Sequence, residues 1–175
     1  MVGGATLATA GLLFAAARSG PCEVASHRAL SVDELIAVRQ RFEAYRSTPE
    51  LGFSLSEEEL GMLLEDPEDV PVFLALEGEQ VHGQVALPAA VGRCWPVAFS
   101  GSLQIDGQKA HFDPARVTLG ALDVGWMLGP GAMELLPEQM PTRRTRTFLE
   151  ATRRGEVVAG RLDVVLVAPE TFRFQ

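Results

Sequence analysis

The chain has 175 residues, of which 47% are hydrophobic, and this suits a single domain with an apolar core. Its formal net charge of −8 argues against binding to a phosphate backbone, so we expect no nucleic-acid partner. The three histidines are scattered, and the chain has no P-loop, dinucleotide-binding motif or nucleophile elbow. We therefore expect no catalytic residues, no cofactor and no metal site, and a protein that is not an enzyme.

The N-terminal segment sets the expected location of the protein. Residues 2–17 carry no charged side chain, and Arg18 is the first one. A helix of this length spans roughly 24 Å, which is less than the ~30 Å hydrocarbon core of a membrane. Two interpretations fit, a signal peptide cleaved near Ala17 and an uncleaved short anchor; a buried helix of a soluble protein is the alternative.

We expect residues 1–17 to be this signal peptide or anchor, residues 18–30 a linker, and residues 31–175 one domain. The domain is expected to be membrane-anchored or exported, outside the cytoplasm, with the membrane as a partner. The apolar side chains that would meet the membrane or partner helices are Leu7, Leu12, Leu13 and Phe14. Small residues recur on one face of this helix at Gly4, Ala8, Gly11 and Ala15, a pattern that permits close helix packing.

The two cysteines, Cys22 and Cys94, leave two alternatives open. Outside the cytoplasm they would be able to form a disulfide that joins the start of the domain to its middle. They are otherwise two unrelated thiols. Their wide separation and the lack of a CxxC motif argue against a zinc site.

Two helix starts are explicit in the first third of the chain. Ser31 and Glu34 form a capping-box pattern, which predicts a helix to about Arg46, ended by Thr48-Pro49. Its expected apolar stripe is Leu35, Val38, Phe42 and Tyr45. Ser56 and Glu59 repeat the capping pattern and predict a second helix, which buries Leu60, Leu63 and Leu64 and ends at Pro67.

The middle of the chain has the alternation of β-strands. Residues 70–76 and 81–87 predict a hairpin, followed by a loop from Pro88 to Pro96. Residues 97–105 predict a third strand, Asp106-Gly107 a tight turn, and residues 108–119 a returning strand that Pro114 breaks or bulges. These strands predict an antiparallel meander.

The C-terminal part returns to mixed signals. Pro130 near a first turn predicts a short helix over residues 130–136. A further helix is expected from Thr142 to Arg154, ended by Gly155, and a single long strand over residues 156–167. The predicted fold class is α+β, an antiparallel β-meander packed against amphipathic helices and preceded by an N-terminal apolar helix.

Apolar and basic clusters supply the candidate site residues. An apolar groove between sheet and helices would bind a ligand with the side chains of Phe99, Leu122, Trp126, Met127, Leu128, Met133 and Leu136. The alternative is that these side chains only fill the core. Arg143, Arg144 and Arg146 are candidates for contact with lipid head groups or an acidic partner, the alternative being an ordinary solvated helix face.

The order of these signals resembles a known family. The residues that carry the resemblance are the run from Phe53 to Leu60, then Gly101-Ser102-Leu103, then the run from Asp113 to Leu122. Over residues 1–140 the chain resembles the membrane-anchored bacterial proteins of the YpmS and YceB type. Gly61 departs from that pattern by replacing an asparagine, and Asp123-Val124 replaces Leu-Pro. The resemblance implies a fold like that of tubular lipid-binding proteins, for which lipid binding is suspected.

The sequence thus yields two hypotheses. The first is a non-enzymatic, membrane-associated domain that binds a lipid or another apolar ligand. The second is a structural accessory subunit of a membrane protein complex, held by its N-terminal helix against the helices of partner subunits.

Overall fold

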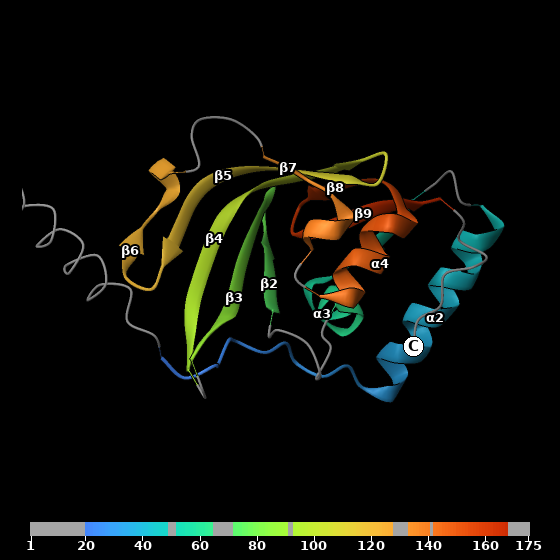
Figure 1. The fold of residues 1–175 in the computed structure, drawn as a ribbon. Helices are drawn as coiled ribbons and strands as arrows, with labels where there is room; N and C mark the ends of the chain where they lie inside the picture. Colours follow the sequence, from blue (N-terminus) through green and yellow to red (C-terminus); the bar gives the residue numbers. More distant parts are fainter. Residues whose placement is uncertain are drawn as a thin grey trace, which may run out of the picture.

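The computed structural model describes residues 20–48, 52–64, 72–90, 93–127, 133–140 and 142–167. In these ranges the chain is an α+β fold, with a large antiparallel sheet and three α-helices (Figure 1). The expected fold class is confirmed at that level. The expected N-terminal apolar helix lies outside the described residues, and none of the helices within them has the length and apolar character needed to cross a bilayer.

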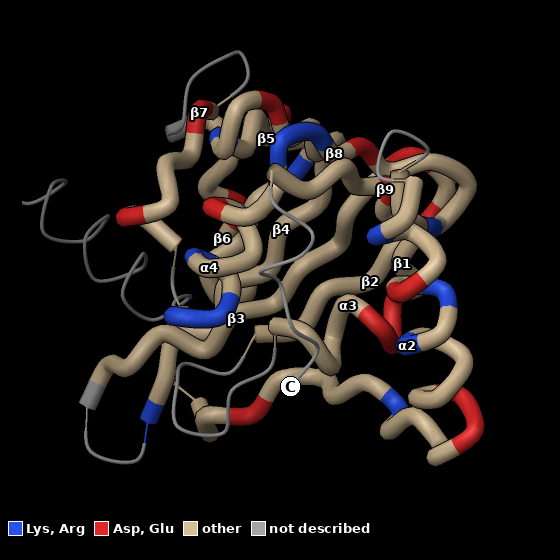
Figure 2. Tube along the Cα trace, turned by 90° about the vertical axis from the view of Figure 1, so that its right-hand side faces the viewer, with Lys and Arg blue, Asp and Glu red and all other residues tan. Residues whose placement is uncertain are grey.

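Helix α2 (Val32–Ser47) begins as predicted, with the Ser31 hydroxyl and the Glu34 side chain completing a capping box. Val38, Phe42 and Tyr45 are buried, but Leu35 is 40% exposed, so its assignment to the buried stripe was wrong. The reason is that only the later turns of α2 meet the sheet. Phe42 and Tyr45 both contact the ring of Phe53, whereas the first turn extends past the core. Acidic and basic positions interleave along this helix (Figure 2).

Helix α3 (Glu57–Leu64) also begins with the predicted capping pair. The Glu59 amide donates to the Ser56 hydroxyl, and the Ser56 amide donates to the Glu59 carboxylate. That carboxylate is nearly buried and is held by ion pairs with Arg41 and Arg161. Because Arg41 lies on α2 and Arg161 on strand β9, one capping residue also ties α3 to two other elements.

The predicted meander is formed by strands β2 (Val72–Glu77), β3 (Gln80–Ala90), β4 (Arg93–Asp106) and β5 (Lys109–Leu119). The expected loop from Pro88 to Pro96 was wrong for the residues that the structure describes there, because the segment 86–90 of β3 pairs with the segment 93–96 of β4. The proline at 88 sits at a register shift in the ladder, where a missing N–H is tolerated. The tight turn lies one residue later than predicted, since Gly107 and Gln108 carry the positive φ angles of 56° and 69°.

The C-terminal elements depart most from the sequence prediction. The expected helix over residues 130–136 is absent from the part described: strand β7 (Met133–Leu135) occupies it, followed by a 3-10 turn, η3 (Pro137–Gln139). Helix α4 (Arg143–Ala151) begins next to the predicted start, with Thr142 as its N-cap, but ends earlier than expected. The buried hydroxyl of Thr152 donates to the Phe148 carbonyl where the backbone becomes extended.

The predicted single strand over residues 156–167 is in fact a hairpin of β8 (Thr152–Val158) and β9 (Arg161–Leu166). Its turn is Ala159-Gly160, with φ angles of 50° and 74°. Gly155 was wrongly expected to end a helix. It lies inside β8 beside Ile105, where a Cβ would be 3.1 Å from the Ile105 Cδ1 atom. The chain therefore makes a tight turn here that its periodicity does not reveal.

The sheet has the order β1-β9-β8-β4-β3-β2, where β1 is Phe53–Leu55, and β5 pairs along the other edge of β4. Two strands pair with the same edge of the long strand β4: β3 pairs with its first part, and β8 pairs with its last part. The turn of the β2–β3 hairpin contacts the turn of the β8–β9 hairpin, because the Gly160 amide donates a hydrogen bond to the Gly78 carbonyl. The helices gather beside β1, β8 and β9 (Figure 1), and the core is centred there, on residues such as Leu55, Leu60, Leu162 and Val164.

Tyr45→Phe is expected to lower the free energy of unfolding by about 1–3 kcal/mol, because the Leu166 amide, which donates to the Tyr45 hydroxyl over 2.8 Å, would be buried without a partner. Phenylalanine keeps the packing of the ring, so the loss of stability measured by urea denaturation with circular dichroism reports the contribution of the hydrogen bond alone. Gln40→Ala on the exposed side of the same helix is the control. Equal stability of the two variants would contradict this contact.

Candidate functional site

A cleft of about 480 Å³ lies over the strands of the meander. Its lining comes from each of four strands and from the turn that follows β5. The lining residues are Phe73, His82, Gly83, Gln84, Ala98, Phe99, Ser100, Arg116, Thr118, Gly120 and Ala121. The volume falls in the range of small-molecule sites, roughly 300–1,000 Å³.

Small side chains and a bulge create this hollow. Ala98 leaves the middle of this face of the sheet low. Gly83 adds no side chain beside it, and a Cβ at Gly83 would point to the opposite face, where it would overlap the ring of Phe99. Between Ser100 and Gly101 the pairing of β4 with β5 shifts register, so Ala115 has no partner on β4. A bulge of this kind bends the strand and turns its neighbouring side chains. Here it lies beside Arg116, at the rim of the cleft.

Strand pairing arranges the lining in cross-strand rows. Gln84, Ala98 and Thr118 are successive partners on β3, β4 and β5, and Phe73 continues that row on β2. Partners in such rows share a face of the sheet and stand close together. The first row therefore alternates the apolar side chains of Phe73 and Ala98 with the uncharged polar side chains of Gln84 and Thr118.

The next row is polar. His82, Ser100 and Arg116 are successive partners on β3, β4 and β5. The His82 Nε2 atom lies 3.5 Å from the Glu77 carboxylate, and the Arg116 Nε atom lies 3.8 Å from the Asp123 carboxylate. All four of these charged or titratable side chains are substantially exposed, so the pairs contribute little to stability. We refer to His82, Ser100 and Arg116 as the polar row.

Residues 20–30, the N-terminal strap, border the cleft. The ring of His27 stacks on Phe73 with centroids 4.5 Å apart, and its Nε2 atom lies 2.6 Å from the Leu74 carbonyl oxygen. Gly61 of α3 makes this possible, because any Cβ there would overlap the imidazole. The Ala25 amide donates to the Gln84 side chain at 3.5 Å. The strap thus touches two lining residues of the cleft.

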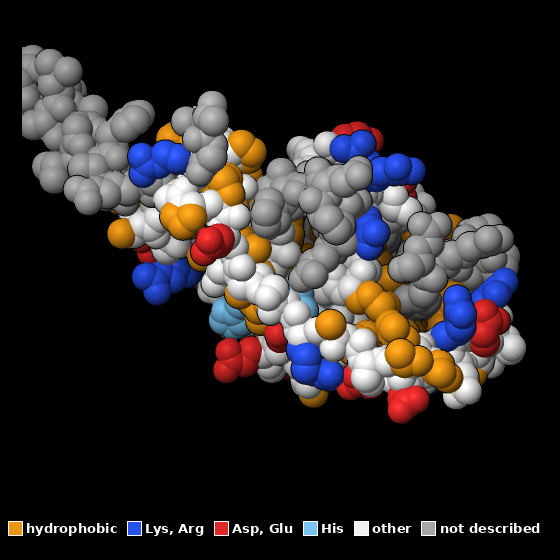
Figure 3. All heavy atoms as spheres, turned by 90° about the horizontal axis from the view of Figure 1, so that it is seen from below, with side chains coloured by type: hydrophobic (Ala, Val, Ile, Leu, Met, Phe, Trp, Pro, Cys, Tyr) orange, Lys and Arg blue, Asp and Glu red, His pale blue; other side chains and the backbone are white. Residues whose placement is uncertain are grey.

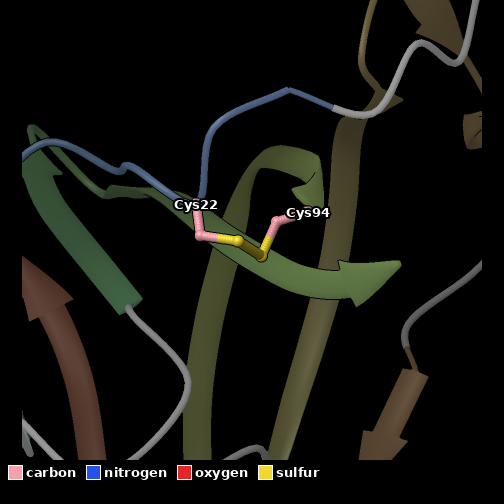
Figure 4. The surroundings of a disulfide bond; sticks show 2 residues. All are labelled: Cys22 and Cys94. Carbon is pink, nitrogen blue, oxygen red and sulfur yellow. A yellow bond between two sulfur atoms is a disulfide. The ribbon is translucent and has the colours of Figure 1, made fainter. Parts of the chain in front are cut away.

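Both ends of the strap are fixed. At its start, Gly20 exchanges two backbone hydrogen bonds with Cys94, and Cys22 forms a disulfide with Cys94 (Figure 4). The alternative of two unrelated thiols does not hold in this structure. At its end, Arg28 pairs with Glu34 over 2.7 Å. Hydrogen bonds from Arg28 and Ser31 lower the pKa of Glu34 from 4.5 to about 2.

Of the apolar ligand candidates, Phe99 is the one that lines the cleft. It also packs edge-on against Phe112 and contacts the core. Leu122 on β6 (Leu122–Asp123) pairs with Leu119, and Met133 on β7 pairs with Phe112. These two points on β5 are seven residues apart, which is about 23 Å along a strand.

The remaining candidates are also dispersed. Leu136 is half-buried at the start of η3, and Trp126, in the 3-10 turn η2 (Gly125–Met127), is 76% exposed. The side chain of Met127 and all of Leu128 lie outside the described residues. The seven candidates therefore do not form one wall, and their role as ligand contacts stays a prediction.

The three arginine candidates lie on α4 and contact the protein itself. The Arg144 guanidinium donates to the Met62 carbonyl at 3.4 Å, and that of Arg146 donates to the Pro137 carbonyl at 3.2 Å. Arg143 is exposed and also has contacts. These bonds hold α4 against α3 and η3. Contact with head groups stays a prediction, as does the role of Leu7, Leu12, Leu13 and Phe14, which lie outside the described residues.

Sequence reasoning missed the polar row. The alternation of residues 81–87 does turn His82 away from the apolar face, and this was the available signal. Pairing with Ser100 and Arg116 depends on long-range register, which the pattern does not contain. Within the described ranges, no group of three or more His, Cys, Asp or Glu residues is arranged to hold a metal ion.

No protein-family model matches the chain, and no curated protein or solved structure is significantly similar to it.

Proposed function

We propose that this protein is a non-enzymatic, membrane-associated domain that binds a lipid or a similar apolar ligand. The observation that carries the proposal is the cleft of about 480 Å³ over β2–β5. Phe73 gives it an aromatic side chain, and the small side chain of Ala98 leaves room beside it. Clefts that combine apolar walls with a few polar groups are the usual form of small-molecule sites.

The position of the strap supports the membrane part of the proposal. The uncharged segment 2–17 precedes Gly20, which pairs with Cys94 beside the end of β5. Next to this point, the Gly120 amide donates to the Pro96 carbonyl, and β6 follows. In Figure 1, β6 and the start of the strap both lie at the left-hand end of the molecule. The exposed Trp126 follows β6, and tryptophan favours the membrane–water interface.

The disulfide supports an extracytoplasmic location. Cys22 and Cys94 are bonded, and structural disulfides persist mainly in oxidising compartments. Export through an N-terminal signal or anchor would deliver the domain to such a compartment.

Native mass spectrometry of the protein purified from its own membrane in mild detergent tests the proposal. We expect an adduct of lipid mass that is lost on activation. In Ala98→Phe the new ring would fill the cleft, so the adduct should fall at least about tenfold, the equivalent of 1.4 kcal/mol. Ala44→Phe adds the same ring to an exposed position on α2 and should leave the adduct unchanged. A chain that carries no adduct, or an adduct equal in both variants, would refute cleft binding.

A second candidate function is that of an accessory subunit in a membrane complex. The observation that favours it is an exposed apolar surface at the start of α2, formed by Val32, Leu35 and Ile36. In Figure 3, hydrophobic side chains gather on the lower face toward this end of the molecule. Exposed apolar groups of this kind occur at protein interfaces. A stoichiometric complex with other polypeptides and no lipid adduct, in the same spectra, would favour this function.

A further inference from the structure

The polar row gives one end of the cleft a chemistry that an apolar ligand alone does not need. His82, Ser100 and Arg116 stand side by side on three neighbouring strands. Since strands lie about 4.8 Å apart, the row is about 10 Å wide, with Ser100 at its centre. A head group placed over Ser100 would be within reach of the longer side chains on either side.

Hydrogen-bond donors in this row remain available. The Ser100 hydroxyl is half-buried and has no partner among the described residues. Arg116 meets Asp123 through its Nε atom at 3.8 Å, which is too long for a hydrogen bond, and its guanidinium makes no hydrogen bond within those same ranges. A guanidinium with both terminal NH₂ groups available matches the two oxygens of a carboxylate or phosphate.

We propose that the cleft takes an anionic amphiphile, with its carboxylate or phosphate head on the polar row and its apolar part over Ala98 and Phe73. This inference rests on the proposed function, because it names the ligand class of the same site. Arg116 and Ser100 donate hydrogen bonds to the head group. His82 lies on the other side of Ser100 from Arg116, at the end of the row. The head group competes with Asp123 for Arg116.

The competition identifies the variants for the test. Arg116→Gln removes the charged donor, and Ser100→Ala removes the central hydroxyl. Asp123→Asn removes the competing carboxylate and leaves Arg116 in place. Arg116 and Asp123 are exposed, where substitutions cost little stability, and Ser100→Ala in the half-buried middle of the row removes only a hydroxyl and adds no bulk. Arg39→Gln, an exposed arginine of α2 outside the cleft, is the matched control.

Isothermal titration of the full chain with three probes of equal chain length, each below its micelle concentration, measures the preference. The probes are dodecanoate, dodecyl phosphate and uncharged dodecanol. We expect at least one anion to bind about tenfold or more tightly than dodecanol, since a charge-assisted pair contributes about 1.5–3 kcal/mol. Arg116→Gln should abolish this preference without weakening dodecanol, Ser100→Ala should reduce it, and Asp123→Asn should increase it.

The outcomes separate the inference from the proposed function. Equal binding of all three probes, or a preference for anions that Arg116→Gln leaves intact, would overturn the inference and leave cleft binding standing. Binding of none of the probes would overturn both. A preference confined to dodecanoate identifies a fatty-acid-like ligand, and one confined to dodecyl phosphate identifies a phospholipid-like head; each supports the inference.

Discussion

Gly101→Ala is expected to lower the free energy of unfolding by about 3 kcal/mol, the upper end of the usual cost of overpacking. The new Cβ would overlap the carbonyl oxygen of Asp113 on the neighbouring strand and would lie 2.9 Å from two atoms of the Phe112 ring. A backbone atom has no rotamer by which to move away, so β4 and β5 would have to separate at the bulge. Chemical denaturation monitored by circular dichroism measures the loss.

Gly20→Ala is the matched control for that variant. Among the described residues, no atom beyond its chain neighbours lies within 4 Å of the position that its Cβ would occupy, and its φ angle does not require glycine. Its stability should remain within about 0.5 kcal/mol of the parent, as for most surface substitutions. If Gly101→Ala were as stable as Gly20→Ala, the described register of β4 against β5 would be wrong.

Removal of the disulfide is expected to cost about 4 kcal/mol. Cys22 and Cys94 are 72 residues apart, and the chain-entropy relation for a loop of that size gives about this value at 25 °C. Alanine is used at both positions, because Cys94 is buried and serine would add an unpaired hydroxyl there. The double variant and the reduced parent should unfold at the same, lower denaturant concentration.

The same variant should also loosen the N-terminal strap. Within the part of the chain that the structure describes, the two backbone hydrogen bonds between Gly20 and Cys94 would remain at its start, and His27 on Phe73 would still hold its middle. Hydrogen exchange should therefore rise at the Gly20 and Cys94 amides before it rises at the core strands. Unchanged stability in the double variant, with the parent shown to be oxidised, would contradict a structural role for the bond.

Local signals predicted the elements whose stabilising contacts are local. Ser31 with Glu34 and Ser56 with Glu59 are neighbours three residues apart, so the sequence contains both halves of each cap, and both helices begin where expected. The alternation of residues 81–87 likewise predicted the β2–β3 hairpin. The weaker predictions failed where a distant partner decides the conformation. Met133 was assigned to a helix, yet it pairs with Phe112 on β5.

The sequence by itself therefore determined the helix starts, the meander and the α+β class, because capping and alternation act over a few residues. Only the tertiary structure decided the hairpin at Ala159-Gly160, the Cys22–Cys94 pairing and the cleft. Each of these depends on which strand lies beside which, and in what register. The polar row illustrates the reason: His82, Ser100 and Arg116 are far apart in the sequence, and a shift of one residue in either pairing would turn part of the row to the opposite face.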